Sequence, residues 1–331
     1  MRNWSARLVL AALAVGALSM MGCQGHSKRD VYYLISNNLK LPYWTTVSQG
    51  FSKAAAEYGV TARIDGPNTY DPQAELLAFE RAVVNKPAGI LISVADAALL
   101  RPEINSAIEA GIPVITVDSD APTSSRLYFI GTNNLEVGHL GGQRLLDKLH
   151  GKGNVVFYTI AGQPNLEERL KGYNDILASH LAIKVMDIFD TKGDPGRAFD
   201  QTEQYLGRTG AEKIDAFVCL ESSSGKAIAE VLKRKNVTDR VVVAMDVDPD
   251  TLNLIKEGTL EATVTQKPFT MGYVGLKALD EIHHNHPKAF RSNYAVDSFS
   301  EYPAFVDTGT ALVDKFNADL YLASAAQAVQ Q

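Results

Sequence analysis

Residues Gly89–Asp118 read GILISVADAALLRPEINSAIEAGIPVITVD and contain one full repeat of a pattern that runs along most of the chain. A continuous apolar run at Gly89–Val94 is followed by an amphipathic segment at Leu99–Ala110 and by a second apolar run at Pro113–Asp118. Strands that are apolar at every position, instead of at alternate ones, are covered on both faces. The repeat therefore predicts a strand, a crossover helix and a second, parallel strand.

The same alternation extends along the chain on both sides of this repeat. The predicted strands are 31–36, 60–65, 89–94, 113–118, 128–131, 154–160, 183–189, 215–220, 240–245 and 261–266. The predicted helices are 44–58, 72–85, 99–110, 135–149, 166–180, 196–206, 223–235, 249–257 and 268–284. Regular alternation of strand and helix predicts an α/β protein with doubly wound parallel sheets. A mature chain of about 300 residues exceeds the usual size of a single core, so we expect two lobes.

Local signals mark several helix ends. Asp71 and Asp248 each precede a proline, so each is predicted to be the N-cap of a helix that begins at that proline. Gly59, Gly111 and Gly258 follow helical segments, where a left-handed residue can end the helix. These ends are therefore predicted without any tertiary contact.

The N-terminus has the features of an export signal. Arg2 and Arg7 lie near a short polar start, and Leu8–Met21 is an apolar run of 14 residues. A helix needs about 20 apolar residues to cross the hydrocarbon core of a bilayer, so this run is too short. We predict that residues 1–22 are a signal peptide and that the mature protein works outside the cytoplasm.

Cys23 follows this run and Gly22 directly, an arrangement that resembles the bacterial lipoprotein signal. The resemblance implies that Cys23 is lipidated and that residues 23–30 form a polar tether. Met20 and Met21 stand where lipoprotein signals usually have leucine or valine and then a small residue. Ordinary signal cleavage nearby, with Cys23 left as a free thiol, stays open as the alternative.

Charge and cysteine content restrict the function classes. The formal net charge is -6, and removal of residues 1–22, which hold two arginines and no acidic residue, gives -8. An acidic secreted chain has no basic surface for nucleic acid or for anionic lipid headgroups. Cys219 has no partner if Cys23 is lipidated, so we expect a fold without a disulfide in which Cys219 is a small buried hydrophobe.

Polar residues stand at the carboxyl ends of several predicted strands, which is where doubly wound sheets bind ligands. They come from both halves of the chain, so a groove between two lobes would collect them. These residues are Ser36, Asn37, Ser93, Asp118, Ser119, Gln163, Glu221, Asp246 and Gln266.

Six short motifs resemble, in the same order, those of periplasmic sugar-binding proteins of the ribose-binding type. They are SNNLKLPYW at 36–44, GIPVITVD at 111–118, IGTNN at 130–134, ERLKGY at 168–173, VAMD at 243–246 and ATVTQKP at 262–268. The resemblance implies the periplasmic binding protein fold of type I, which also forms the ligand domains of lactose-repressor-like regulators. In this fold two doubly wound parallel-sheet lobes are joined by a three-segment hinge and close on a ligand.

The resemblance also implies domain boundaries. The chain would cross between the lobes after the IGTNN motif, at the ATVTQ strand and again near the C-terminus. The N-terminal lobe would comprise residues 31–132 and 268–292, and the C-terminal lobe residues 133–266 and 293–320. Residues 321–331 would be a tail.

For the ligand site, the resemblance implies aromatic and charged contacts. Tyr43 and Trp44 match two aromatic residues that pack on the apolar C–H faces of a sugar ring. The alternative is that both start a helix and pack in the core. Asp118 and Asp246 match aspartates that accept from sugar hydroxyls, and Arg169 matches an arginine that donates two or more bonds. As isolated residues, Asp and Arg are more often helix caps or surface ion pairs.

The predicted ligand set is completed by Ser36, Asn37, Ser119, Glu221 and Gln266, the last of which matches a glutamine at a lobe crossing. Ser119 stands where ribose binders have an arginine. Leu220, followed by Glu221, stands where they have an asparagine. These departures favour a sugar or polyol other than ribose.

Two other patterns are weighed against this interpretation. The segment His283–His286 (HHNH) is rich in histidine, yet adjacent helical residues point about 100° apart, so we expect a solvated helix end and no metal. Asp118 and Asp246 resemble the paired carboxylates of a glycosidase, but hydrolysis needs one of them protonated. A neighbouring Arg169 is expected to lower the pKa of both and keep them ionised. We therefore expect neither an enzyme nor a cofactor.

The function that these features favour is an extracytoplasmic solute-binding protein of an ABC-type importer. We expect a monomer that closes on a monosaccharide or similar polyol and presents the closed form to a permease in the inner membrane. The alternative is a sensor whose closed form docks on a chemoreceptor or a histidine-kinase ectodomain. A repressor would need a helix-turn-helix where the export signal lies.

Overall fold

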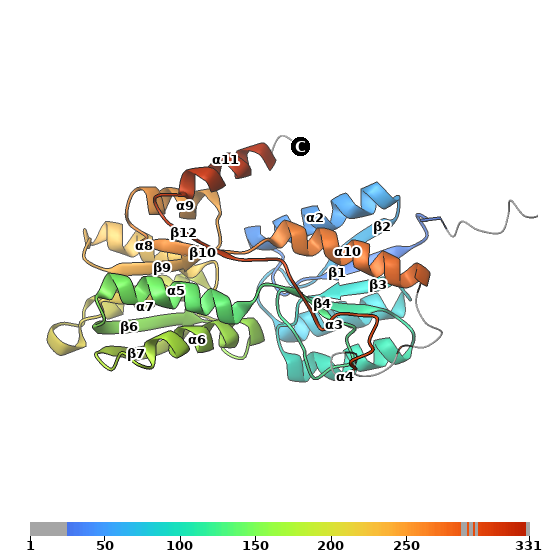
Figure 1. The fold of residues 1–331 in the computed structure, drawn as a ribbon, viewed down its shortest axis with the longest axis horizontal. Coiled ribbons are helices and arrows are strands. Elements are labelled where there is room, and N and C mark those ends of the chain that lie inside the picture. Colours follow the sequence, from blue (N-terminus) through green and yellow to red (C-terminus); the bar gives the residue numbers. More distant parts are fainter. Residues whose placement is uncertain (1–24, 286–289, 291–293, 295–296, 329–331) are drawn as a thin grey trace, which may run out of the picture.

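The computed structural model describes residues 25–285, 290, 294 and 297–328. The predicted signal peptide, Cys23, His286 and the boundary expected at 292 and 293 lie outside the described residues. The described chain forms two α/β lobes that lie end to end along the long axis of the molecule (Figure 1). Each lobe contains one six-stranded sheet with helices packed against it.

The first lobe holds the N-terminal part of the chain and two segments from further along it. Its strands are β1 (Val31–Ile35), β2 (Thr61–Asp65), β3 (Gly89–Ile92), β4 (Val114–Val117), β5 (Phe129–Gly131) and β11 (Phe305–Asp307). Its helices are α2 (Pro42–Tyr58), α3 (Pro72–Val84), α4 (Ala97–Glu109) and α10 (Pro268–Asn285). The strand order is β11-β5-β4-β3-β1-β2, and each neighbouring pair is parallel.

The second lobe repeats this plan. Its strands are β6 (Gly153–Thr159), β7 (Ile183–Asp190), β8 (Ala216–Cys219), β9 (Val241–Met245), β10 (Ala262–Thr265) and β12 (Ala311–Val313). Its helices are α5 (Asn134–Leu149), α6 (Pro164–Leu177), α7 (Pro195–Leu206), the short 3-10 helix Gly210–Glu212, α8 (Ser224–Arg234), α9 (Pro249–Lys256) and α11 (Ala318–Ala328). The order is β12-β10-β9-β8-β6-β7, and only the β10–β12 pair is antiparallel among these described strands.

The fold class predicted from the alternation of strand and helix is confirmed. Each strand and helix predicted between residues 31 and 284 is present, with ends that shift by a few residues. Every residue of β3 and of β4 is buried, as their continuous apolar character predicts. Cys219 is free and fully buried in the second lobe, as expected.

The predicted helix ends are also present. Asp71 accepts hydrogen bonds from the backbone N–H groups of Gln73 and Ala74, and Asp248 caps α9 in the same way. Gly59 adopts a left-handed conformation with φ 69° at the end of α2. Within the described ranges, no helix combines the length and the apolar character needed to cross a membrane.

The C-terminal part of the chain differs from the expected division. Residues 293–320 were expected in the C-terminal lobe, but β11 pairs with β5 in the sheet of the first lobe, and only β12 joins β10 in the second. The third crossing therefore lies between Asp307 and Ala311. The predicted tail contains most of helix α11, which packs against α9.

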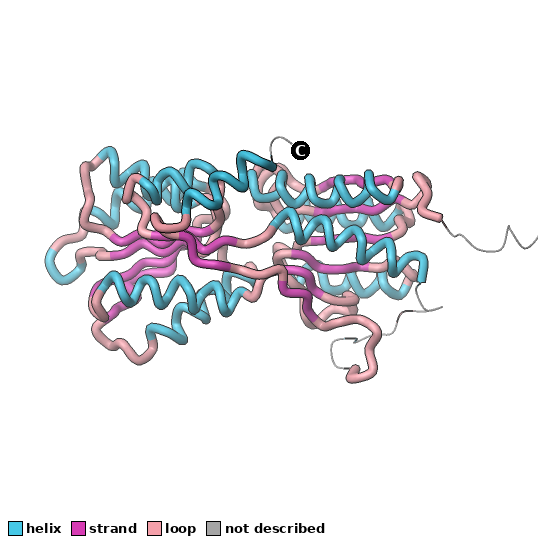
Figure 2. The backbone as a smooth tube through the Cα atoms, turned by 45° about the horizontal axis from the view of Figure 1, so that its top comes forward, coloured by secondary structure: helices cyan, strands magenta, loops and turns pink. Residues whose placement is uncertain are grey.

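Three crossing segments run side by side between the two sheets (Figure 2). The hydroxyl of Thr132 in the first crossing donates to Gln266 Oε1 in the second at 3.0 Å. In the third crossing, the Thr308 N–H donates to the Gly131 carbonyl at 2.8 Å, and the Thr310 hydroxyl donates to the Thr265 carbonyl at 2.8 Å. These bonds join the crossings into one hinge, which a few torsions can bend without unfolding either lobe.

Candidate ligand-binding site

Side chains from both lobes line one cavity at the carboxyl ends of the strands, next to the hinge. The cavity encloses about 50 Å³, well below the roughly 300 to 1,000 Å³ of small-molecule sites, so the lobes must move apart to admit a ligand of that size. The first lobe contributes Asn37, Asn38, Leu41, Tyr43, Trp44, Tyr70 and Asp118. The second lobe and the hinge contribute Ile160, Gln163, Asn165, Leu166, Arg169, Gly193, Glu221, Ser222, Ser223, Asp246 and Gln266.

Asp118 and Asp246 occupy equivalent places in the two lobes. Asp118 follows β4 and Asp246 follows β9, and both have a left-handed backbone, with φ 63° and 68°. The Asp118 N–H donates to the carbonyl of Ile130 on the next strand, and the Asp246 N–H donates to Val264 in the same manner. Left-handed residues other than glycine are uncommon and cluster at functional sites. The two turns therefore bring one carboxylate from each lobe to the cavity.

Asp118 accepts a hydrogen bond at each of its oxygens. The Tyr43 hydroxyl donates to Oδ1 at 2.8 Å, and Asn165 Nδ2 donates to Oδ2 at 3.3 Å. Tyr43 belongs to the first lobe and Asn165 to helix α6 of the second. The second of these bonds therefore spans the cleft and joins the lobes in a closed arrangement.

Arg169 is 2% exposed and makes three hydrogen bonds within the protein. Its Nε donates to Asn134 Oδ1 at 2.9 Å, its Nη1 to the Leu220 carbonyl at 2.8 Å, and its Nη2 to Gln266 Oε1 at 2.9 Å. A guanidinium carries five N–H groups, so two remain for a ligand. Gln266 in turn donates from Nε2 to Asp246 Oδ1 at 3.0 Å. Gln266 thus links Arg169 to Asp246.

Close packing of α5 on α6 places Arg169. A Cβ built on Gly138 of α5 would lie 2.2 Å from the carbonyl oxygen of Arg169, and one built on Gly172 of α6 would lie 2.3 Å from the Leu135 carbonyl. Only glycine permits such an approach of two helix backbones. Gly138 and Gly172 therefore serve the packing of the two helices.

Tyr43 and Trp44 were expected either to contact the ligand or to pack in the core, and the structure combines the two. The Tyr43 and Trp44 rings meet edge to face at 5.4 Å and 82°. Trp44 is 2% exposed and belongs to the core of the first lobe, yet both residues line the cavity. Burial raises the pKa of Tyr43 well above 10, so its hydroxyl stays protonated and donates to Asp118. The core therefore holds the two rings rigidly at the cavity wall.

The pKa shifts of the two aspartates differ from the expectation. Burial raises the pKa of Asp246 from 3.8 to about 7, although Arg169 and the bond from Gln266 lower it. Burial also raises the pKa of Asp118, and Arg169 and Tyr43 offset this only in part. Arg169 lowers the pKa of both aspartates, as predicted, but desolvation outweighs this attraction, so the net shift of each pKa is upward.

Glu221 lines the cavity but its carboxylate caps helix α8. Oε2 accepts from the backbone N–H and the hydroxyl of Ser223, each at 2.6 Å, and Oε1 accepts from the N–H of Ser224 at 3.0 Å. Ser223 stands at the N-cap of α8 but makes no side-chain cap bond of its own. Both oxygens of Glu221 therefore have partners at the helix N-terminus, where negative charge is favourable.

Ser36 and Ser119 do not line the cavity, in contrast to the prediction. Both are fully buried. The Ser36 hydroxyl accepts from the Asn38 N–H at 3.1 Å and so shapes the loop after β1. The Ser119 N–H donates to the Val117 carbonyl at 2.6 Å, and its Oγ is buried without a hydrogen-bond partner among the described residues. These serines support loops that carry the neighbouring site residues.

Several lining residues were not predicted. Asn165 lies four residues before Arg169 on α6, so the helical period places both on one face, and this spacing was a usable signal. Asn38 Oδ1 is buried and has no hydrogen-bond partner in the part of the chain that the structure describes. Tyr70 precedes α3 and packs against the apolar core of the second lobe, a contact that only the closed arrangement of lobes creates.

Several known proteins of similar sequence are named as sugar-binding proteins. The Ribose import binding protein RbsB of Haemophilus influenzae is 27% identical over 281 residues, which cover 83% of this chain and 90% of that protein. The D-allose-binding periplasmic protein of Escherichia coli is 25% identical and covers 75% and 83%, respectively. Among solved structures, an ABC transporter solute binding protein of Burkholderia graminis in complex with D-arabinose is 27% identical, with a TM-score of 0.79 over 88% of this chain and 96% of that one.

A family model described as the periplasmic binding protein domain matches residues 32–285. This match covers the six motifs from 36–44 to 262–268, and it confirms the resemblance they indicate. The fold agrees with that of the Burkholderia graminis protein over most of both chains. The chain therefore belongs to the periplasmic binding protein family.

Proposed function

We propose that this protein is the extracytoplasmic solute-binding component of an ABC-type importer and holds a monosaccharide or similar polyol between its lobes. The observation that carries the proposal is the cavity itself, where one carboxylate from each lobe lies near a buried arginine whose remaining N–H groups have no protein partner. The similar proteins named for ribose, D-allose and D-arabinose support a sugar as the ligand class.

The polar groups of the cavity suit a polyhydroxylated ligand. Asp118 and Asp246 accept from hydroxyls, Arg169 donates its two remaining N–H groups, and the unpartnered Asn38 Oδ1 accepts one more hydroxyl. Each bond to a charged group contributes roughly 1.5 to 3 kcal/mol. The Trp44 ring offers an apolar plane for the C–H face of a sugar. Such a site holds hydroxyls in fixed directions, which is the basis of stereochemical selection.

Access to the cavity requires the hinge to open. The bond from Asn165 to Asp118 crosses the cleft, and Tyr70 packs on the second lobe close to Gly193. Both contacts break when the lobes separate. A wider groove between the lobes shares Asp246 and Gln266 with the cavity and gives the direction of approach. Ligand binding then favours the closed state, because only that state brings both sets of contacts to one molecule.

We propose binding without catalysis. The raised pKa of Asp246 removes the electrostatic argument against hydrolysis, so the proposal depends on other observations. Asp118 accepts one bond at each oxygen, from Tyr43 and Asn165, and the second lone pair of each oxygen can accept from a sugar hydroxyl. The named relatives are binding proteins. Incubation with the bound sugar, followed by chromatography, should return it unchanged, and a hydrolysis or isomerisation product would refute the proposal.

A sensory role is the second candidate, because the closed form presents the same outer surface to any partner. The two roles differ in their dependence on the permease. In a strain without the permease gene, uptake of the sugar should stop, and a role in transport alone predicts that no response to the sugar remains. A retained response would favour docking on a chemoreceptor or histidine-kinase ectodomain.

We propose a periplasmic location with an anchor on Cys23. The family supports the periplasmic location. The lipoprotein-like sequence around Cys23 supports the anchor. Labelling of cells with a fatty-acid analogue should mark the wild-type protein and not Cys23→Ser, and the variant should appear in the soluble periplasmic fraction. Unlabelled wild-type protein would favour ordinary signal cleavage.

The function is tested by thermal shift of the purified mature protein against a panel of pentoses, hexoses and polyols. A ligand that binds the folded state raises the midpoint by mass action. We expect one sugar, and not ribose, to give the largest shift, and light scattering should show a monomer with and without it. A protein whose midpoint responds to no member of the panel would contradict the proposal.

A further inference from the structure

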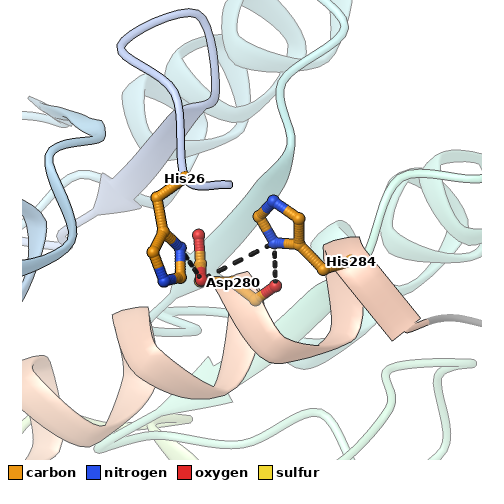
Figure 3. A group of neighbouring side chains, drawn as sticks. All are labelled: His26, Asp280 and His284. Carbon is orange, nitrogen blue, oxygen red and sulfur yellow. Dashed lines mark hydrogen bonds and ion pairs between the residues drawn. The ribbon is translucent and has the colours of Figure 1, made fainter. Parts of the chain in front are cut away.

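The segment before β1 and the last turns of α10 bring two histidines and an aspartate together (Figure 3). Asp280 and His284 lie four residues apart on α10, and His26 reaches them from the N-terminal segment. His26 Nδ1 lies 2.8 Å from Asp280 Oδ2, and His284 Nδ1 lies 3.6 Å from the same oxygen. One atom from each residue lies within 4.8 Å of the other two.

Neighbouring groups hold these three side chains in place. Asp280 is 2% exposed, and its other oxygen, Oδ1, accepts from the Tyr32 hydroxyl at 2.9 Å, so Oδ2 faces both histidines. The His26 ring stacks on Tyr58 at 4.4 Å with an interplanar angle of 11°. Such outer contacts orient ligands in metal sites and are part of a built site.

We propose that His26, Asp280 and His284 bind a divalent transition metal of the zinc class. Two imidazoles and a carboxylate are ligands that zinc accepts, and a tetrahedral ion at about 2.0 to 2.2 Å from its ligands places them roughly 3.3 Å apart. The two distances to Asp280 Oδ2, 2.8 and 3.6 Å, lie on either side of that value. Small side-chain rotations therefore suffice to bring the ligands to an ion.

The present contacts of His284 are compatible with a metal at this site. His284 Nδ1 now lies 2.9 Å from the Asp280 backbone carbonyl, a contact that the metal would replace. Its Nε2 lies 3.8 Å from Asp30 Oδ2. A carboxylate near the far nitrogen of a ligating histidine can orient its ring. Asp30 is placed to do this for His284 after a small side-chain shift, and water would complete the coordination.

The contacts of His283 and His284 differ from the expectation that adjacent helical histidines point apart. Nε2 of each lies 3.8 Å from one oxygen of Asp30, and the two rings meet edge to face at 5.2 Å, while His284 also faces Asp280. The second histidine ligand comes from His26, which no helical spacing reveals. Both interpretations of the export signal keep His26 in the mature chain. A bound ion would tie the N-terminal segment to α10, far from the sugar cavity.

Calorimetric titration of Zn²⁺ into the untagged mature protein tests the site. We expect one equivalent to bind, and His26→Ala and His284→Ala each to weaken binding at least tenfold. His139→Ala is the matched control, because His139 also lies near two carboxylates, at 3.6 Å from Glu136 and 3.7 Å from Asp175, without a second histidine. Asp280→Asn is avoided, because Asp280 is buried and holds Tyr32. Loss of binding in His139→Ala, or none in His26→Ala, would overturn the assignment.

A second measurement reports on the N-terminal segment itself. Lys28 and Arg29 are exposed and follow His26, so trypsin can cut there. Zn²⁺ should slow this cleavage in the wild type and not in His26→Ala. Cleavage of casein under the same conditions controls for inhibition of trypsin by Zn²⁺. Protection that depends on low pH and not on Zn²⁺ would assign the cluster to ion pairs between protonated histidines and Asp280, and would refute the metal site.

Discussion

Asn165 donates to Asp118 across the cleft, with 3.3 Å between Nδ2 and Oδ2, and so connects helix α6 of the second lobe to the end of β4 in the first. Both residues also line the cavity. A contact that exists only when the lobes are together stabilises the closed state directly. The same aspartate that we propose as a ligand acceptor is therefore part of the closing mechanism.

Asn165→Ala should weaken sugar binding mainly by faster dissociation. Loss of one such bond costs about 1 kcal/mol, or roughly fivefold in the dissociation constant. Stopped-flow fluorescence with the sugar found in the panel measures both rate constants. Asn174→Ala, an exposed position on the same helix, is the control. An unchanged dissociation rate, or an equal change in the control, would show that this contact does not stabilise the closed state.

Asp246→Asn should change how stability depends on pH. Folding raises the pKa of Asp246 from 3.8 to about 7, so between these values the folded chain binds more protons than the unfolded one. The contribution of Asp246 to the free energy of unfolding is therefore fully present below pH 3.8 and is lost as the pH rises through about 7. Asparagine can still accept from Gln266 but does not ionise.

The difference in unfolding free energy between Asp246→Asn and the wild type should therefore shift in favour of the variant from about pH 5 to about pH 8. Urea unfolding of the sugar-free proteins measures it. Asp200→Asn, an exposed position on α7, should show no such trend. Parallel pH profiles of wild type and Asp246→Asn would show that the carboxyl is not desolvated.

Glu221→Gln should destabilise the second lobe. The carboxylate caps α8 through Ser223 and Ser224, and a neutral amide loses both acceptor strength and the favourable charge at the helix N-terminus. The expected loss is about 1 kcal/mol in the free energy of unfolding. Urea titration measures it against Glu230→Gln, an exposed residue on the same helix. Equal midpoints for the two variants would contradict the capping role.

Gly138→Ala should damage both folding and binding. Its methyl group would lie 2.2 Å from the Arg169 carbonyl, so α5 and α6 must separate and move Arg169. Overpacking of this kind costs typically 1 to 3 kcal/mol, estimated roughly from other cores. Thermal unfolding and sugar titration of the folded fraction report the two effects. Gly207→Ala, where φ is -72° and the nearest atom is 3.3 Å away, is the control and should change neither.

Most of the fold was predictable because its signals are local. Strands such as β3 and β4 are apolar at every position, and Asp71 and Asp248 mark helix starts by their own side chains. The strands β11 and β12 were missed because each is short and neither is fully buried, unlike the equally short β5. Their place depends on pairing with β5 and β10, far earlier in the chain.

The site was predictable where residue type and strand end coincide. Asp118, Asp246 and Arg169 come together as the motifs imply. Ser36 and Ser119 follow strands too, but both are fully buried and do not line the cavity, which sequence position does not show. The pKa of Asp246 depends on the balance between desolvation and the attraction of Arg169, and the extent of burial is a property of the folded chain.

Calorimetric titration of the panel's best sugar into wild type and Asp246→Ala tests the central claim most directly. The account predicts one binding site in the wild type and a loss of ~2 kcal/mol in the variant, near thirtyfold in the dissociation constant. Asp200→Ala should bind as the wild type does. An unchanged dissociation constant in a folded Asp246→Ala protein would show that the ligand is not held between the two lobes at this carboxylate.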